Sequence, residues 1–261
     1  MNILDTIIAS KQNEVSRLKK KSRERILEEG RFTHRAPLSL KERLIGESSS
    51  GVIAEFKRRS PSKGEICAAA DPVWITRGYA DAGAAGLSVL TDHPFFGGSV
   101  DDLLNVREAH PNIPILRKEF IIDPHQVAEA RACGADVILL IAACLSREEV
   151  HSLTAEAKSL GLEVLLEIHG PEDMEKISPQ VDLVGVNNRN LKTFTVDVAV
   201  SLELAPQIPG HFVKISESGI SSPASVLLLR EAGYRGFLIG ESFMKTGDPG
   251  TTCAAFISAL S

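Results

Sequence analysis

The chain contains eight short apolar segments rich in β-forming residues, which recur roughly every 20 to 35 residues and are separated by amphipathic stretches. This alternation is typical of βα units, and nearly unbroken apolar character is what parallel strands need when both faces are buried. The predicted strands are 51–57, 87–91, 113–119, 136–142, 163–168, 183–188, 212–217 and 236–240. Eight units favour an α/β fold closed as a (β/α)8 TIM barrel over a doubly wound sheet, and no GxGxxG turn follows an early strand.

The segments before several strands resemble one another, because each runs from a helix through a glycine into a strand. Their sequences are YADAGAAGLSVL, ARACGADVILL, AKSLGLEVLL and LREAGYRGFLIG. Glycine readily adopts the left-handed conformation that ends many helices, so each segment predicts a helix stop and a short loop. The repetition supports a series of consecutive βα units.

Residues 1 to about 47 do not fit this repeat. Apolar side chains there lie at helical spacing among many lysines and arginines, namely Ile3, Ile7, Ile8, Val15 and Leu18. We therefore expect one domain over residues 1–261, in which residues 1–47 form an N-terminal helical extension. The sequence leaves open whether this extension caps one end of the barrel or covers the substrate.

Composition excludes several classes of protein. The 29 basic and 34 acidic residues give a formal net charge of -5, without the positive excess of a general nucleic-acid binder. The four cysteines (Cys67, Cys133, Cys144 and Cys253) lack CxxC or Cys/His spacing, which predicts neither a zinc site nor a disulfide framework. The N-terminus lacks a signal-peptide pattern, and no apolar run is long enough to span a bilayer. We expect a cytoplasmic protein that binds neither membranes nor nucleic acid.

Polar residues end several of the predicted strands, where the active site of a (β/α)8 barrel lies. They are Glu55, Lys57, Lys118, Glu167, Asn187, Arg189 and the stretch 216–219. Period-2 alternation places Glu55 and Lys57 on one face of their strand, with Ala54 and Phe56 on the other. A lone lysine at a strand end is usually a solvated surface group. Converging charges of both signs, however, cost free energy unless they pair or meet a charged ligand, so the group predicts acid-base catalysis.

Two glycine-containing segments follow the last two strands, at residues 216–220 (SESGI) and 239–242 (IGES). In barrel enzymes these positions commonly offer backbone N–H groups to a phosphate. Each segment alone could be a tight turn that needs glycine for its backbone. Their joint presence after these two strands predicts a phosphate site.

Longer motifs extend these features along nearly the whole chain. They are ILDTIIASKQNEVSRLKK at the N-terminus, IAEFKRRSPSKG (53–64), LSVLTDHPFFGGS (87–99), ILRKEFIIDPHQ (115–126), LLEIHG (165–170), VGVNNRNLKTF (184–194), SESGI (216–220) and LIGESFM (238–244). Through them the chain resembles the indole-3-glycerol phosphate synthase family, a group of carboxy-lyases. The most diagnostic segment is 53–64, since other phosphate-binding barrels do not end their first strand with Glu-x-Lys-x-x-Ser-Pro-Ser.

The resemblance implies a reaction and a set of catalytic residues. The family converts 1-(o-carboxyphenylamino)-1-deoxyribulose 5-phosphate into indole-3-glycerol phosphate, CO2 and water in tryptophan biosynthesis, without metal or organic cofactor. By resemblance, Lys118 is the general acid that protonates the ketone oxygen, and Lys57 binds substrate anions and assists dehydration. Glu55 and Glu167 match the carboxylates that handle protons and orient the lysines. Asn187 aligns with the first member of a polar pair on the sixth strand.

The resemblance also implies the binding residues. Those assigned to the substrate are Ser60, Phe96, Phe120, Arg189, Leu191 and Ile239, and those assigned to the phosphate are Ser218, Gly219, Gly240 and Glu241. The fourth strand contributes to the pocket from within 137–141, at a position that no motif fixes. A lid contact near Ser10 and Lys11 also stays open. The expected partner is the small-molecule substrate, with association to other enzymes of the tryptophan pathway as a further possibility.

Two alternative functions compete with this interpretation of the sequence. Phosphoribosylanthranilate isomerase is a related barrel with a similar phosphate cradle, but it typically ends its first strand with a cysteine, where this chain has Glu55-Phe56-Lys57. A barrel that binds a phosphate ligand without catalysis would be indicated by loss of a catalytic lysine or carboxylate, and none is missing. Both alternatives are disfavoured.

Overall fold

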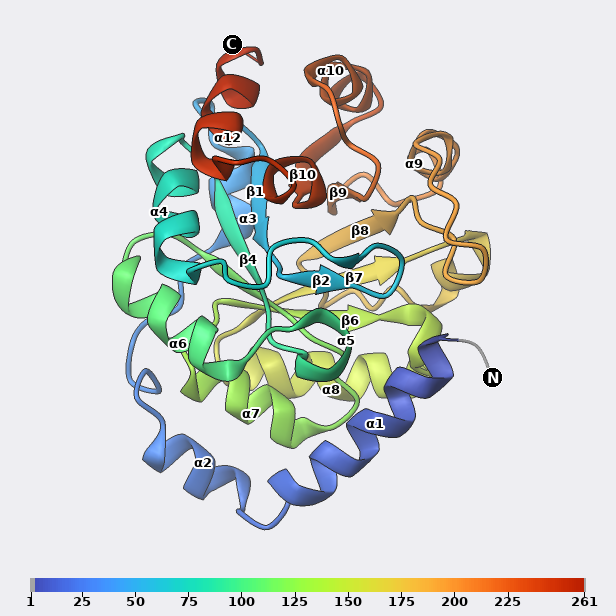
Figure 1. The fold of residues 1–261 in the computed structure, drawn as a ribbon. Helices are drawn as coiled ribbons and strands as arrows, with labels where there is room; N and C mark the ends of the chain where they lie inside the picture. Colours follow the sequence, from blue (N-terminus) through green and yellow to red (C-terminus); the bar gives the residue numbers. More distant parts are fainter. Residues whose placement is uncertain (1–2, 261) are drawn as a thin grey trace.

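A computed structural model describes residues 3–260 as a closed barrel of eight parallel strands (Figure 1). The strands are β1 (Val52–Phe56), β4 (Gly86–Leu90), β5 (Ile115–Lys118), β6 (Val137–Ile141), β7 (Glu163–Ile168), β8 (Leu183–Asn187), β9 (Val213–Glu217) and β10 (Tyr234–Ile239). Pairing of β1 with both β4 and β10 closes the barrel. The (β/α)8 fold is confirmed, and every strand boundary lies within two residues of its predicted position.

Helices surround this barrel. They are α4 (Pro72–Asp81), α5 (His93–Phe96), α6 (Val100–Ala109), α7 (Pro124–Ala132), α8 (Arg147–Ser159), α9 (Ala199–Leu204), α10 (Pro223–Glu231), α11 (Glu241–Met244) and α12 (Pro249–Ser258). Short 3-10 helices follow β6 at Ala142–Cys144 and β7 at Pro171–Lys176, where the regular repeat predicted an α-helix after β7. Among the described helices, none has the length and apolar character needed to cross a bilayer.

Local sequence explains where the helices begin and end. Asp71, Asp123, Ser222 and Asp248 each precede a proline and accept a backbone N–H from the first turn of their helix. The four helix-ending glycines, Gly83, Gly134, Gly161 and Gly233, all have left-handed φ values, as predicted.

Side chains of the strands alternate between two apolar layers. Val52, Ala54 and Phe56 of β1 belong to the layer between the barrel and its helices, whereas Ile53 belongs to the barrel interior. Glu55 follows Ile53 by two residues and therefore also points inward, toward the C-terminal end of the barrel. This register delivers the polar strand ends to a common space.

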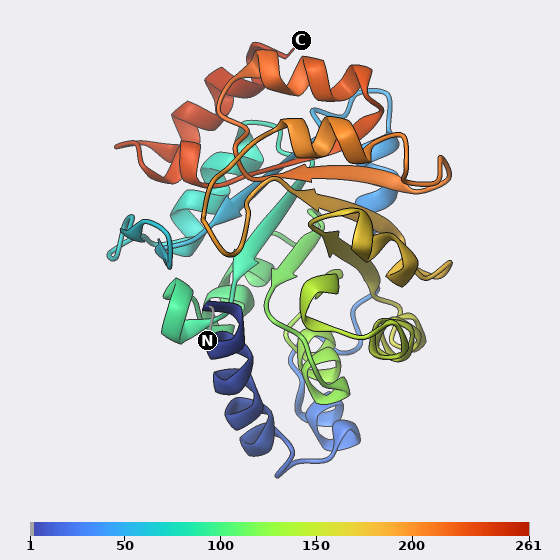
Figure 2. The ribbon, with the colours of Figure 1, turned by 90° about the vertical axis from the view of Figure 1, so that its right-hand side faces the viewer.

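The N-terminal extension consists of three helices with different roles, α1 (Ile3–Leu18), α2 (Arg23–Glu29) and α3 (Leu40–Ile45). Leu40 and Leu44 of α3 pack into the interior layer, and Glu163 at the start of β7 accepts the backbone N–H of Leu40 at 2.9 Å. Helix α3 therefore closes the N-terminal end of the barrel. Helix α2 packs on α7, and α1 runs beside the same helix (Figures 1 and 2).

The first residues of α1 lie at the opposite end of the barrel, where the sequence left open whether the extension covers the substrate. Ile3, Leu4 and Ile7 line the cavity at the C-terminal end of the barrel. The extension therefore closes the N-terminal end of the barrel through α3 and lines the cavity through α1. One further element was not predicted, a two-stranded hairpin of β2 (Arg59–Ser60) and β3 (Gly64–Glu65) in the loop after β1.

Candidate active site

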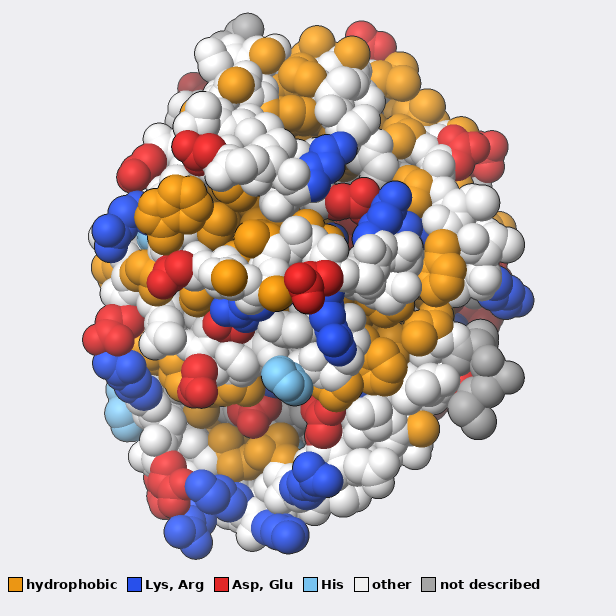
Figure 3. All heavy atoms as spheres, viewed as in Figure 1, with side chains coloured by type: hydrophobic (Ala, Val, Ile, Leu, Met, Phe, Trp, Pro, Cys, Tyr) orange, Lys and Arg blue, Asp and Glu red, His pale blue; other side chains and the backbone are white. Residues whose placement is uncertain are grey.

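A cavity of about 640 Å³ lies at the C-terminal ends of the strands, and every residue predicted for the site lines it. Leu139 and Ile141 of β6 also line it, which settles the position that the fourth strand contributes. On the face drawn in Figure 3, basic and acidic side chains lie close together near the centre. The lining of the cavity likewise carries charges of both signs, in a molecule whose formal net charge is -5.

The first charged pair comes from β1. Lys57 Nζ donates a hydrogen bond to Glu55 Oε1 at 2.7 Å, and Ser88 Oγ of β4 lies 3.5 Å from Glu55 Oε2. Gly240, at the end of β10, makes room for this carboxylate, because a Cβ there would lie 2.8 Å from Glu55 Oε1. Any side chain at Gly240, which was predicted to bind phosphate, would therefore collide with Glu55.

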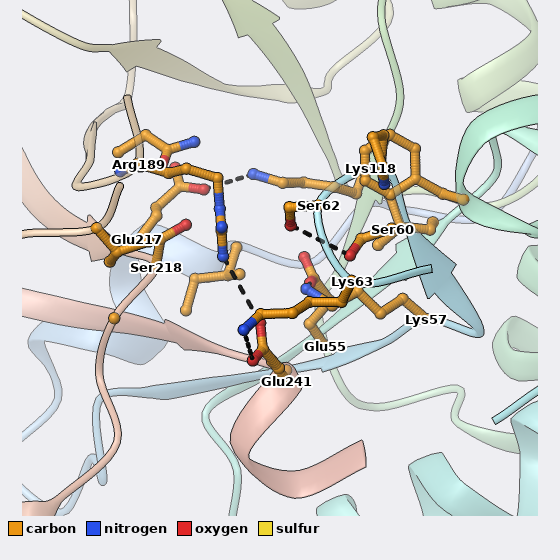
Figure 4. A pocket seen from close by; sticks show the side chains of 18 of the residues that line it. Glu55, Lys57, Ser60, Ser62, Lys63, Lys118, Arg189, Glu217, Ser218 and Glu241 are labelled. Carbon is orange, nitrogen blue, oxygen red and sulfur yellow. Dashed lines mark hydrogen bonds and ion pairs between the residues drawn. The ribbon is translucent and has the colours of Figure 1, made fainter. Parts of the chain in front are cut away.

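Lys118 lies between the buried carboxylates of Glu167 and Glu217, and Figure 4 shows Lys118 and Glu217 on the wall of the cavity. Its Nζ donates to Glu167 Oε2 at 3.0 Å and to Glu217 Oε2. Burial alone would lower the pKa of Lys118, but the negative charges of Glu217, Glu167 and Glu55 outweigh it and raise that pKa above its ordinary value. Lys118 therefore keeps its proton at neutral pH, as a general acid must before it reacts.

The two carboxylates beside Lys118 have opposite pKa shifts. Burial would raise the pKa of Glu167, but Lys118, His169 and a hydrogen bond from Asn187 at 3.2 Å lower it overall. Burial raises the pKa of Glu217, and the charge of Glu167 adds to this rise against the opposing effect of Lys118. Pairs of titratable groups whose pKa values are driven apart commonly divide acid and base roles between them.

Glu217 is absent from the predicted site residues. It lay within the polar stretch 216–219 at the end of its strand, in which only Ser218 and Gly219 were assigned a role, in phosphate binding. The signal that identified Glu167, a carboxylate at the end of an apolar strand, also applies to Glu217. Gly185 of β8 leaves the space that it fills, since a Cβ there would lie 2.3 Å from Glu217 Oε1.

A second group of charges lies at the opening of the cavity. Arg189 and Lys63 each approach the carboxylate of Glu241 to 3.6 Å, from two directions (Figure 4). Asn187 accepts the backbone N–H of Arg189 at 3.0 Å, which fixes the loop after β8. Lys63 and Lys245, which are both exposed, line the cavity but were not predicted.

The turn after β9 contains two consecutive residues with left-handed backbone. The φ values are 66° at Ser218 and 76° at Gly219, and Asn188 Nδ2 donates to Ser218 O at 3.0 Å. A non-glycine residue in this conformation is strained by roughly 1–3 kcal/mol and persists only where its surroundings hold it. The buried Asn188 thus fixes the shape of the turn that offers Ser218 and Gly219 to the cavity.

We expect Gly219→Ala to weaken binding of inorganic phosphate about tenfold. Left-handed backbone costs a Cβ-bearing residue about 1–2 kcal/mol, and the new Cβ would lie 2.5 Å from Val196 Cγ1. Isothermal titration calorimetry measures the affinity. Gly83→Ala is the matched control, because Gly83 has a φ of 88° but no neighbouring atom within 4 Å of its Cβ position. Equal phosphate affinity in both variants would contradict the assignment of this turn to phosphate.

The opposite wall of the cavity is apolar. The rings of Phe96 and Phe120 lie 5.9 Å apart between centroids, and both line the cavity together with Leu191 and Ile239. Ser60 lies on the β2–β3 hairpin, with its Oγ 3.5 Å from that of Ser62. The site therefore combines an aromatic wall, a charged centre and a polar turn in one space.

Comparisons with known proteins agree with this geometry. The model of the family described as indole-3-glycerol phosphate synthase matches residues 4–256. The chain is 51% identical to the indole-3-glycerol phosphate synthase of Bacteroides thetaiotaomicron, over 99% of both chains, and 45% identical to that of a Polaromonas species, over 97% of both. A 3-hexulose-6-phosphate synthase from Salmonella typhimurium shares only the fold, with 14% identity and a TM-score of 0.65 over 80% of this chain and 97% of its own. The chain therefore belongs to the indole-3-glycerol phosphate synthase family, whose members are decarboxylating, ring-closing lyases of tryptophan biosynthesis.

Proposed function

We propose that the cavity binds 1-(o-carboxyphenylamino)-1-deoxyribulose 5-phosphate and that Lys118 is the general acid of its ring closure. The observation that carries this proposal is the position of Lys118, whose ammonium lies between two buried carboxylates in a cavity with an aromatic wall. The aryl ring lies against Phe96 and Phe120. The phosphate lies at the other end, near Ser218 and Gly219.

In the first step the aromatic carbon attacks the ketone carbon and the new carbon–carbon bond forms. Lys118 gives its proton to the ketone oxygen, which becomes a hydroxyl, while the ring loses its aromaticity and positive charge develops on nitrogen. Loss of CO2 then returns the electron pair of the breaking carbon–carbon bond to the ring. The apolar wall excludes water from the aryl end of the substrate. This favours ring closure and decarboxylation, because water would otherwise stabilise the charges of the bound substrate before the transition state is reached.

The last step removes water. The hydroxyl leaves as water after it accepts a proton, and a proton is lost from the substrate as the indole double bond forms. We assign the acid role in this step to Lys57, which also binds substrate anions. Glu55 orients Lys57 at 2.7 Å. Glu167 orients Lys118 and accepts a proton, and Asn187 holds Glu167 in place.

The phosphate site draws on both strand ends. Ser218 and Gly219 after β9, and Gly240 and Glu241 after β10, hold the phosphate mainly through backbone N–H groups. Arg189 and Lys63 supply positive charge from the opening of the cavity. Because both side chains approach Glu241 in the structure, an incoming phosphate competes with this carboxylate for the two cations.

The direct test is incubation of the purified protein with the proposed substrate in the presence of excess EDTA. We expect indole absorbance and fluorescence to appear at a rate proportional to enzyme. Conversion of phosphoribosylanthranilate instead would indicate the isomerase alternative. Folded protein that binds the anilino substrate but releases no indole would indicate a binding protein without catalysis.

We further propose that the protein works in the cytoplasm and associates with other enzymes of the tryptophan pathway. All four cysteines are free thiols, which is typical of a reducing compartment. Association is checked by analytical ultracentrifugation of the protein mixed with the enzyme that supplies its substrate.

A further inference from the structure

Lys11 of α1 is almost completely buried, with 1% of its side chain exposed. Its Nζ lies 2.7 Å from Asp92 Oδ1, 3.0 Å from Glu119 Oε1 and 2.8 Å from Glu14 Oε2. A buried ammonium is costly unless opposite charges surround it, and two of these three carboxylates are themselves buried. We call Lys11, Glu14, Asp92 and Glu119 the Lys11 cluster.

The two buried carboxylates of the Lys11 cluster also fix the backbone that carries the aromatic wall. Asp92 caps α5, where its Oδ2 accepts the backbone N–H groups of Phe95 at 2.8 Å and Phe96 at 3.1 Å. Glu119 directly follows Lys118, the last residue of β5, and its Oε1 accepts the backbone N–H of Phe120 at 2.8 Å. One ammonium therefore lies against both acceptors that position the two phenylalanines.

The same helix supplies an apolar edge of the cavity. Ile3 and Ile7 precede Lys11 by eight and four residues, so all three lie on one face of α1. Ile3 and Ile7 line the cavity. In both ribbon views the N-terminal end of α1 lies near α5, the helix that Asp92 caps (Figures 1 and 2).

We infer that Lys11 is a positioning residue that couples docking of α1 to the placement of Phe96 and Phe120, so that the aryl end of the cavity is complete only when α1 is docked. This inference rests on the proposed function, in which the aryl ring of the substrate lies against these two phenylalanines. The phosphate end of the cavity is built from the ends of β9 and β10, and none of its residues belongs to the Lys11 cluster.

The charge of Lys11 is stable across the neutral range. Burial alone would lower the pKa of Lys11, but the carboxylates of Glu119 and Asp92 outweigh it and raise this pKa above its ordinary value. The pKa of Glu119 is lowered in turn, because the charges of Lys11 and Arg117 outweigh the effect of burial. The coupling is therefore a permanent part of the site rather than a pH switch.

The test compares two ligands in two variants. Lys11→Met keeps the length of the side chain and removes its charge, and we expect it to weaken binding of indole-3-glycerol phosphate about tenfold, within the range usual for coupled sites. Binding of inorganic phosphate should not change. Lys19→Met is the matched control, because Lys19, the residue that follows α1, also joins the extension to the barrel through Asp123 at 2.6 Å, but is 49% exposed and lies outside the aromatic wall. It should leave both affinities unchanged.

Hydrogen–deuterium exchange provides a second measurement, the change in amide protection of α1 when ligand binds. A purely structural role of Lys11 would not alter this change. In the wild type, saturating indole-3-glycerol phosphate should increase protection of the amides of α1, and in Lys11→Met this increase should be lost. If Lys11→Met does not fold, Lys11→Gln, which keeps a donor without the charge, carries the same comparison. Equal weakening of both ligands, or behaviour identical to Lys19→Met, would overturn the inference.

Phe96→Ala separates this inference from the proposed function. If Phe96→Ala leaves the affinity for indole-3-glycerol phosphate unchanged, the aryl ring does not bind at this wall and the proposed placement of the substrate is wrong. If Phe96→Ala weakens binding but Lys11→Met does not, the placement stands and only the role of Lys11 is rejected.

Discussion

Replacement of Lys118 with methionine is expected to lower kcat by roughly 10³-fold or more, with little change in the affinity for inorganic phosphate. The ammonium lies within hydrogen-bond distance of Glu167 and Glu217, and methionine offers no proton to the ketone oxygen. Without an acid in this position, the oxygen would carry a full negative charge in the transition state of ring closure. Indole fluorescence under saturating substrate measures kcat directly.

The control for this variant is Lys158→Met. Lys158 also pairs with a carboxylate, Asp182, at 2.7 Å, but it is part of α8 and is 38% exposed. We expect this variant to retain wild-type turnover, because exposed ion pairs contribute little. Circular dichroism establishes that both variants are folded. Wild-type turnover in folded Lys118→Met would rule out Lys118 as the acid.

The second large effect is expected for Glu167→Gln, which should lower kcat by roughly 10²- to 10³-fold. The amide keeps the shape of the side chain and its contact with Asn187, but it cannot accept a proton and does not attract the ammonium of Lys118. Turnover that stays at the wild-type level in Glu167→Gln would contradict the role of this carboxylate.

We also predict the direction in which the pH dependence of kcat shifts in Glu167→Gln. Glu217, Glu167 and Glu55 raise the pKa of Lys118, so the wild-type enzyme keeps its acid protonated and loses activity only above the ordinary lysine range. Glu167→Gln removes one of these negative charges and so lowers the pKa of Lys118. Lys118 then loses its proton at lower pH, and the alkaline limb of the kcat profile therefore moves to lower pH. Glu217→Gln should move the limb in the same direction, because Glu217 makes the other contact with this lysine. A limb that stays in place in both variants would show that Lys118 does not control this titration.

The fold and most of the site could be predicted because their signals are local in the sequence. Strands buried on both faces give apolar runs, and glycines with left-handed backbone, such as Gly134, mark helix ends at a fixed distance before the next strand. Closure of eight such units brings all strand ends to one face. Glu55, Lys118 and Glu167 could therefore be assigned to one cavity from their positions at strand ends.

The features that escaped prediction depend on contacts between residues that are distant in the chain. Glu217 reaches Lys118 because Gly185, on a neighbouring strand, leaves the space for its carboxylate. Leu139 and Ile141 face the cavity because barrel closure sets which alternate residues of β6 point inward. The division of the N-terminal extension into helices that cap and cover the barrel depends in the same way on which surfaces they meet.

The sequence by itself thus determined the barrel, the polar strand ends and the glycine-containing turns after the last two strands, since periodicity, glycine conformation and strand-end chemistry depend on neighbouring residues in the chain. Only the tertiary structure decided that Lys11, in the first helix, is buried against Asp92 and Glu119 and joins α1 to the aromatic wall. A lysine in an amphipathic helix has the same local pattern whether it faces water or a buried carboxylate. What distinguishes the two cases is the free energy of the ion pairs it forms after the chain has folded.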